Sequence, residues 1–258
     1  MYLPILPQRD CASAWREAVR AVDAQGGHSA YNVIIDVADP TLDATRQDPR
    51  IAVVDDFLNC FDKSVETVAN TIMPAGLYRR YGAPAFFDVF HDRVLGKVRR
   101  NARWSGYYFE RMTRVPVSDG EPINQLWGIV ERIRNENVRA LNKFELTVFD
   151  PSRDVDESPY GGQCLSFLSF KLVPGATKTL SLTAVYRNHF YIEKLLGNLI
   201  GLGRLMAFVA NESGVAVGPL TVVSTHAEID KPGGARRSDI ATLVSNFDQA
   251  EQAMTIVA

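Results

Sequence analysis

Residues whose side chains can act on a small polar substrate recur between positions 164 and 226. They are Cys164 after Gly-Gly-Gln, Arg187 within Tyr-Arg-Asn, Asn198 within an apolar glycine-rich stretch, and His226 at the end of Ser-Thr-His. A thiol reacts as the thiolate, and a nearby guanidinium favours that form by lowering the thiol pKa. An arginine at a strand end can also bind phosphate or carboxylate through two parallel hydrogen bonds. One interpretation is therefore a nucleophilic cysteine beside an anionic ligand.

Each of these residues also has a plainer interpretation. Most unpaired intracellular cysteines are buried apolar groups, and an arginine is about as often solvated or salt-bridged as bound to a ligand. Asn198 is more informative, because an amide inside an apolar helix costs about 1–3 kcal/mol unless a ligand pocket or nearby backbone supplies hydrogen bonds. His226 could contact a ligand or make a structural hydrogen bond, and Cys164 with His226 or His189 could form a hydrolase pair.

The composition is that of a soluble globular protein. The 258 residues are 46% hydrophobic and 22% charged, and such a chain can bury a core without disulfides or metal. We predict a single domain over residues 1–258. The formal net charge of -2 lacks the basic character of proteins that bind bulk nucleic acid.

The sequence does not indicate a membrane protein or a metalloprotein. No apolar run approaches the roughly 20 residues that span a bilayer, and prolines interrupt the N-terminal segment where a signal peptide would lie. The three cysteines, Cys11, Cys60 and Cys164, are widely spaced and do not pair with histidines at zinc-like intervals. We expect a cytoplasmic protein with no membrane partner.

Two sequence periods divide the chain. Helical spacing of apolar residues predicts helices over 11–24, 57–72, 86–100 and 122–133, with one early strand over 31–37. Extended runs then predict strands over 144–149, 164–172, 179–186 and 217–225, and helical spacing predicts helices over 191–210 and 239–253. Gly197, Gly201 and Gly203 each cost a helix on the order of 1 kcal/mol against alanine, so close packing on a sheet is the expected compensation. We predict an α/β (α+β) fold in which a large mixed β-sheet carries helices on one face.

The order and spacing of the polar segments resemble the thymidylate synthase family, which includes the pyrimidine hydroxymethylases. The segments are Cys164, Tyr186-Arg187-Asn188, Gly197-Asn198 and Thr225-His226, and they match that family's Pro-Cys-His, Gln-Arg-Ser, Phe-Asn and Asp-x-His-x-Tyr blocks almost without gaps. The match runs from about Asn142 to Glu228. It implies a thymidylate-synthase-like fold that forms a homodimer through its sheet and takes a pyrimidine nucleotide as substrate.

The resemblance implies a role for each matched residue. Cys164 would add to C6 of the pyrimidine ring, which makes C5 a nucleophile toward a one-carbon unit from 5,10-methylenetetrahydrofolate. The product would carry a methyl or a hydroxymethyl group. The nucleotide would be bound by Arg187 at its phosphate, by Asn198 at the O4/N3 edge of a uracil-type base and by His226 at its sugar, with Asn188 in place of the family's serine.

Further charged positions follow from the same resemblance. The arginine pair that reaches phosphate across the family's dimer interface falls at Asn142-Lys143, so Lys143 would supply one cation, and Arg139 is a candidate for another. Glu66 is the nearest candidate for the family's general base, with Glu110 behind it. A solvated helix residue is the alternative for Glu66, because a general base needs a reachable proton and a pKa tuned by burial.

The chain also departs from the family. Leu165 stands where the family has a histidine, Phe190 where an aspartate holds the folate pterin, and Glu228 where a tyrosine binds the sugar. Cofactor-binding residues therefore stay unassigned. The leading hypothesis is a divergent one-carbon transferase, and the alternatives are a non-catalytic nucleotide-binding sensor or partner protein of the same fold, and a Cys-His hydrolase.

Overall fold

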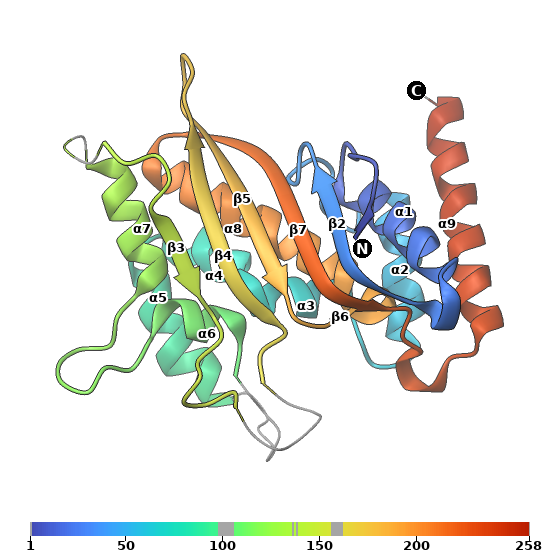
Figure 1. The fold of residues 1–258 in the computed structure, drawn as a ribbon, viewed down its shortest axis with the longest axis horizontal. Helices are drawn as coiled ribbons and strands as arrows, with labels where there is room; N and C mark the ends of the chain where they lie inside the picture. The colour runs from blue at the N-terminus through green and yellow to red at the C-terminus, as the bar shows by residue number, and fades with distance from the viewer. Residues whose placement is uncertain (1, 98–105, 136, 138, 156–161, 258) are drawn as a thin grey trace.

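The computed structural model describes residues 2–97, 106–135, 137, 139–155 and 162–257 (Figure 1). Its α-helices are α1 (Cys11–Asp23), α2 (Pro49–Asn59), α3 (Val65–Ile72), α4 (Ala75–Tyr81), α5 (Ala85–Val89), α6 (Tyr108–Thr113), α7 (Gln125–Arg134), α8 (Leu196–Ser213) and α9 (Arg237–Val257). Short 3-10 or π-helical turns are η1 (Gly26–His28), η2 (Phe90–Val94), η3 (Leu95–Lys97), η4 (Tyr191–Leu195) and η5 (Pro232–Gly234). Among these described segments, none has both the length and the apolar character that a membrane-crossing helix needs.

The described strands form one mixed seven-stranded sheet. They are β1 (Leu3–Pro4), β2 (Ser29–Val37), β3 (Phe144–Thr147), β4 (Leu165–Val173), β5 (Thr179–Tyr186), β6 (His189–Phe190) and β7 (Ala216–Glu228). Their order is β1-β2-β7-β5-β4-β3, and β6 pairs with β7 beside this path. β5 and β7 are parallel, whereas β2 with β7, β3 with β4, and β4 with β5 are antiparallel. A parallel pair needs a crossover, and the segment that contains α8 supplies it.

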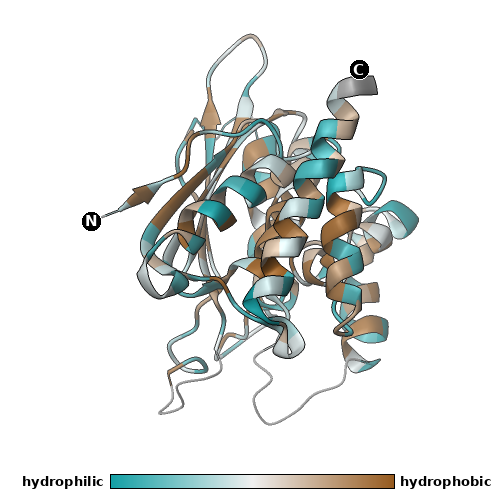
Figure 2. Ribbon diagram, turned by 90° about the vertical axis from the view of Figure 1, so that its right-hand side faces the viewer, coloured by the Kyte–Doolittle hydropathy of each residue, from teal (hydrophilic) through white to brown (hydrophobic). Residues whose placement is uncertain are grey.

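Helices gather on one face of this sheet (Figure 2). Along β5, Leu180, Leu182, Ala184 and Tyr186 are buried, while the residues between them are half-buried. This alternation is what a strand shows when one of its faces is covered and the other is not. The predicted large mixed sheet with helices on one face is therefore confirmed.

The strand register brings segments that are distant in sequence to one end of the sheet. Leu165 at the start of β4 lies opposite Tyr186 at the end of β5, and Tyr186 lies opposite Ser224 of β7. The backbone N–H of Arg187 donates to the Cys164 carbonyl oxygen at 2.8 Å. The polar segments that the sequence analysis selected on β4, β5 and β7 therefore meet at this end.

The glycines of α8 allow close packing against α3 and a loop, and not against the sheet as the sequence predicted. A Cβ atom on Gly197 would lie 2.6 Å from Val68 Cβ. A Cβ atom on Gly203 would meet the backbone carbonyl of Pro40. α8 is buried over most of its length, so the missing side chains let neighbouring backbone approach an almost fully enclosed helix.

We expect Gly203→Ala to lower the free energy of unfolding by about 1–3 kcal/mol, because the new methyl group would overlap the Pro40 backbone. This cost would outweigh the roughly 1 kcal/mol by which alanine favours a helix over glycine. Gly76→Ala in α4 is the matched control, since no atom lies within 4 Å of its added carbon. Urea unfolding measures both variants, and equal unfolding free energies would contradict the packing argument.

Candidate functional site

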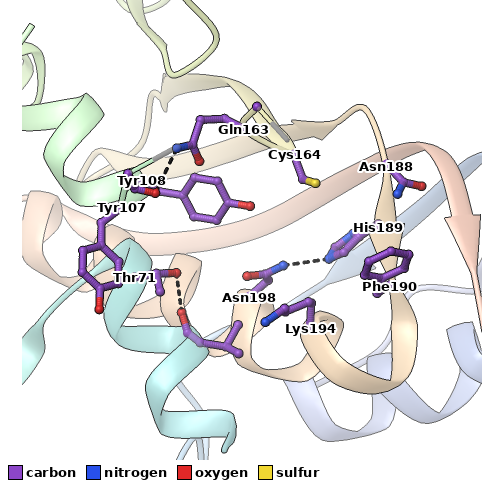
Figure 3. Close-up of a pocket in the computed structure, with 13 residues that line it drawn as sticks. Thr71, Tyr107, Tyr108, Gln163, Cys164, Asn188, His189, Phe190, Lys194 and Asn198 are labelled. Carbon is purple, nitrogen blue, oxygen red and sulfur yellow. Dashed lines mark hydrogen bonds between the residues drawn. The ribbon is translucent and has the colours of Figure 1, made fainter. Parts of the chain in front are cut away.

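A cavity of about 280 Å³ lies at the end of the sheet where the polar segments meet (Figure 3). Its lining comes from several elements: Val68 and Thr71 of α3; Gly106, Tyr107 and Tyr108 at the start of α6; Gly162, Gln163 and Cys164 before β4; Asn188, His189 and Phe190 around β6; Lys194 of η4; and Asn198 of α8. Cys164, Asn188 and Asn198, which the sequence analysis selected, therefore share one cavity.

Two side chains fix the segment that carries Cys164. Gln163 is 3% exposed, and its Nε2 donates to the Gly106 carbonyl oxygen at 3.0 Å. Arg187 Nε donates to the Gln163 carbonyl oxygen at 3.0 Å. The segment before β4 is thus tied both to the segment before α6 and to the end of β5, which gives the thiol a defined direction.

The Cys164 thiol points into the cavity (Figure 3). Burial raises its pKa, and the charges of Arg187 and Lys194 partly oppose this effect. Burial removes water from the thiolate, whereas a nearby cation stabilises it. The effect of Arg187 that the sequence interpretation expected is present, but burial outweighs it and keeps the thiol protonated at neutral pH.

Tyr108 is a cavity residue that the sequence analysis did not select. Burial raises the pKa of its hydroxyl group, the Cys164 side chain adds to the rise, and backbone hydrogen bonds from Leu165 and Cys164 oppose it. The hydroxyl group therefore stays protonated, and it points into the same space as the thiol (Figure 3). It can donate a hydrogen bond to a ligand beside Cys164.

Asn198 is part of a buried hydrogen-bond network. Its Nδ2 lies 2.9 Å from His189 Nε2, and His189 Nδ1 lies 3.0 Å from Ser224 Oγ. Tyr191 donates its hydroxyl hydrogen to the same Oγ at 3.3 Å. Asn198 is 3% exposed, and its Oδ1 is buried with no hydrogen-bond partner in the described chain. The amide nitrogen of Asn198 therefore has a hydrogen-bond partner, whereas its oxygen, on the side of the cavity, has none in the described chain.

The histidines near the cavity hold amides and do not contact the thiol. His189 bonds Asn198 and Ser224, and burial lowers its pKa to about 3, so its ring is neutral. His226 Nδ1 lies 2.6 Å from Asn188 Oδ1, which places His226 behind a cavity residue and outside the lining itself. Within the described chain the structure therefore does not assemble the Cys-His pair of a hydrolase.

Glu66 lies outside the cavity. Its side chain is 60% exposed, and the hydrogen bonds that it accepts from Arg204 lower its pKa. Val68 and Thr71 are the residues of α3 that line the cavity, whereas Glu66 lines a neighbouring hollow on a different side of the same helix. The structure thus does not bring the selected carboxylate to Cys164.

Glu110, the second candidate for the general base, lies close to the cavity. Its Oε2 is buried with no hydrogen-bond partner in the part of the chain that the structure describes. A Cβ atom on Gly106, which lines the cavity, would lie 2.7 Å from this oxygen. Glu110 itself does not line the cavity, so it is not placed to exchange a proton directly with a ligand there.

Lys143 and Arg139 lie at the opposite end of the sheet from Cys164 in the same chain. Lys143 is exposed just before β3, and β3 begins where Phe144 lies opposite Phe170 of β4. Phe170 is separated from the start of β4 by roughly 17 Å of extended strand. These cations therefore reach the cavity only if a second copy of the chain supplies them.

The comparison with known proteins agrees with the resemblance seen in the sequence. No protein-family model matches the chain, but curated proteins named "Putative thymidylate synthase" do. The one from Methanothermobacter marburgensis is 26% identical over 183 residues, which are 64% of this chain and 75% of that protein. Those from Methanococcoides burtonii and Methanothermobacter thermautotrophicus are 29% and 33% identical over 43% and 42% of this chain. The matched region spans only about half the length of these two relatives, 48% and 45%.

The chain is thus similar, at low identity, to putative thymidylate synthases. Two of its departures from the thymidylate synthase family bear on the cavity. Leu165 is fully buried in the core, and Phe190 lines the cavity with 37% of its surface exposed. No carboxylate lines the cavity in the described chain. The lining therefore does not fit a folate whose pterin is held by a carboxylate.

Lys194 is the cation that lines the cavity in the described chain, whereas Arg187 lies outside the lining. The Lys194 side chain is 40% exposed, and Nζ lies 2.7 Å from Glu193 Oε1. Nζ points into the cavity on the side of Asn198 (Figure 3), and its charge lowers the pKa of the Cys164 thiol. The thiol is thus influenced by positive charge from two segments, Arg187 just after β5 and Lys194 in η4.

Alkylation of Cys164 by iodoacetamide should be slow at pH 7 and accelerate as the pH rises, because burial raises the thiol pKa and the thiolate is the reactive form. Lys194→Met should slow the reaction at pH 8 by a further factor of about 2–5, since loss of the cation raises that pKa again. A Cys60→Ser background removes the exposed thiol, and Lys178→Met at an exposed position is the matched control. Full reaction of Cys164 at pH 6, or equal rates in the two lysine variants, would contradict this account.

Proposed function

We propose that this chain activates C5 of a pyrimidine nucleotide by adding Cys164 to C6 and transfers a one-carbon unit to C5. The observation that supports this is the placement of the Cys164 thiol and the unpartnered Asn198 amide oxygen around one cavity (Figure 3). C6 and N3 are opposite corners of a pyrimidine ring. A base that Asn198 holds at N3 would therefore present C6 toward the sulfur.

Addition and elimination at the base form a balanced cycle. The thiol loses its proton and the Sγ–C6 bond forms, while the C5=C6 electron pair moves toward C5 and O4. C5 then bonds either an electrophilic carbon or a proton from water. Loss of the original C5 proton returns the electron pair, expels the thiolate and restores the double bond. Without a donor, the same cycle exchanges the C5 hydrogen with water.

The cavity residues support this cycle through charge and hydrogen bonds. Arg187 and Lys194 stabilise the thiolate, and the protonated hydroxyl of Tyr108 can donate to the charge that develops on the base. The donor implied by the resemblance is 5,10-methylenetetrahydrofolate, which would supply a methylene group and, for a methyl product, a hydride. Because the described lining offers no carboxylate to a pterin, no residue is assigned to that donor.

A homodimer is proposed to complete the phosphate site. Arg187, next to the cavity residue Asn188, would bind the phosphate, and Lys143 and Arg139 would come from the second copy. The uncovered face of the sheet is the proposed contact surface, where Tyr31 is 66% exposed and its ring lies 5.1 Å from that of His226. Light scattering coupled to gel filtration tests this assembly, and a monomer with full nucleotide affinity would argue against it.

The decisive experiment measures tritium release from 5-tritiated uridine and cytidine nucleotides, each as ribose and deoxyribose forms, with and without 5,10-methylenetetrahydrofolate. Tritium release from any nucleotide supports activation of C5. Release without the donor indicates exchange of the C5 hydrogen with water, whereas release that requires the donor indicates transfer of the one-carbon unit. A covalent adduct between Cys164 and a 5-fluoropyrimidine nucleotide, detected by mass spectrometry, would identify the nucleophile. Absence of both release and adduct across the panel would rule out the proposed chemistry.

A second candidate function is a non-catalytic nucleotide-binding protein of the same fold. Two observations favour it: burial keeps the Cys164 pKa raised, and no carboxylate lines the cavity in the described segments. Such a protein would bind nucleotides without labilising C5. It would show equal nucleotide-induced increases in melting temperature for the wild type and Cys164→Ala, and no adduct with the 5-fluoro nucleotide.

A further inference from the structure

We propose that His189 is a positioning residue that holds the Asn198 amide with its carbonyl oxygen toward the cavity and thereby sets which pyrimidine edge is accepted. This inference deepens the proposed function and rests on it. Neither the resemblance nor the relatives point to His189. The sequence suggests His189 only as a possible partner for Cys164, whereas in the structure it bonds Asn198 and Ser224.

Hydrogen-bond accounting assigns the orientation. An amide NH₂ group can only donate, so His189 Nε2, 2.9 Å from Asn198 Nδ2, must accept. The neutral ring then carries its hydrogen on Nδ1, which donates to Ser224 Oγ at 3.0 Å. Ser224 Oγ also accepts from Tyr191. Of the described side-chain atoms in this network, Asn198 Oδ1 is the one with no hydrogen-bond partner at all, and that oxygen is left to the ligand.

The imidazole has no freedom to change this arrangement. His189 is 2% exposed, and its ring lies nearly parallel to that of Tyr186, with 4.1 Å between centroids and 12° between planes. The Tyr191 ring meets it edge-on at 5.5 Å. A ring flip would break both hydrogen bonds inside an apolar stack, where an unpaired polar group is costly. The tautomer of His189 is therefore locked to the orientation of the Asn198 amide.

The locked orientation has a consequence for the base. If Cys164 meets C6, the atom across the ring from it is N3, which carries a hydrogen in uracil and a lone pair in cytosine. Asn198 Oδ1 attracts the former and repels the latter. A site with a buried acceptor discriminates strongly against a ligand that leaves this acceptor unpaired. His189 thus converts an ambiguous amide, which could serve either base by turning over, into one that favours an N3–H.

The test compares dissociation constants of uridine and cytidine 5′-monophosphate, as ribo- and deoxyribonucleotides, by isothermal titration calorimetry. The wild type should favour the uridine forms by about tenfold or more. His189→Phe keeps an aromatic ring on Tyr186 but removes the acceptor, so the amide can turn over and the preference should fall to within about threefold. His91→Phe is the control, because His91 is also buried and bonds Thr113 Oγ1 at 2.9 Å, but does not line the cavity. An unchanged preference in folded His189→Phe would overturn the inference.

A measurement on the wild type covers the case in which His189→Phe does not fold. Nitrogen-15 NMR of histidine-labelled protein should show His189 with a protonated Nδ1 and an unprotonated Nε2, and the reverse would refute the assigned orientation. The two failures are separable. If no pyrimidine nucleotide binds, the proposed function fails and the tautomer alone decides the positioning role. If nucleotides bind but the base preference does not depend on His189, the function stands and this inference fails.

Discussion

Cys164→Ala should abolish tritium release from C5 of the preferred nucleotide, with a loss of at least roughly 10³-fold, because Cys164 carries the one thiol that lines the cavity in the described chain. Nucleotide affinity should change little, since the proposed contacts with the base and phosphate come from Asn198 and Arg187. Tritium release and calorimetry on the same preparation measure the two quantities. A large loss of release with retained binding is the signature of a nucleophile.

Matched variants distinguish the loss of a nucleophile from a general disruption of the folded protein. Cys60→Ser changes an exposed cysteine at the end of α2 and should leave release unchanged. Cys164→Ser keeps the shape of the side chain but offers a hydroxyl group, which is a far weaker nucleophile at neutral pH, so release should remain lost. If Cys164→Ala retains release, the resemblance would hold for the binding of nucleotides and not for covalent chemistry.

The part of the site that strands position could be predicted from the sequence, because it follows from strand order and register. The extended runs before Val173, Tyr186 and Glu228 were visible as strands, and their pairing places Cys164, Arg187 and Asn188 at one end of the sheet. Asn198 was recognisable because a lone amide in an apolar helix requires partners. Its actual partner, His189, lies nine residues away, and no helical or strand period predicts that contact.

The sequence does not show which side of a helix or strand faces the cavity. α3 turns Val68 and Thr71 inward and Glu66 outward, and a helical period fixes relative faces but not the neighbour that each face meets. Lys194 resembles an ordinary surface lysine until η4 turns it toward Cys164. Tyr108 stood in an aromatic and basic stretch of Trp104 to Arg114, and part of that stretch lies outside the described residues.

The helical half shows the same limit. The mostly polar residues 38–50, with two prolines, predict a loop, but α2 begins within them. Asp48 accepts from Arg50 N there, and Pro49 occupies the first turn. Aspartate followed by proline marks a turn as well as a helix start, so the local pattern was ambiguous. The glycines of α8 correctly indicated a close approach, but the approaching backbone belongs to α3 and the Pro40 loop, which only tertiary structure decides.

Asp154→Ala is expected to lower the free energy of unfolding by about 3–5 kcal/mol, because it removes the buried carboxylate that pairs with a buried arginine. The side chains of Arg111 and Asp154 are 5% and 1% exposed. Two hydrogen bonds of 2.8 and 3.2 Å join them, and Asp154 Oδ2 also accepts from the Asp150 backbone N–H at 2.9 Å. Chemical unfolding measures the loss. Glu145→Ala, which breaks an exposed pair with Lys171, is the control and should cost less than about 1 kcal/mol.

The same variant should weaken nucleotide binding in the folded protein, because the Asp154 backbone supports the segment that carries Cys164. A Cβ atom on Gly162 would lie 3.4 Å from the Asp154 carbonyl oxygen and 3.5 Å from Arg187 Nη2, so Gly162 is enclosed between the ion pair and the proposed phosphate-binding cation. Its φ of 67° favours glycine. Calorimetry below the unfolding transition should therefore show weaker binding for Asp154→Ala and unchanged binding for Glu145→Ala. Equal affinities would mean that the ion pair stabilises the fold without shaping the cavity.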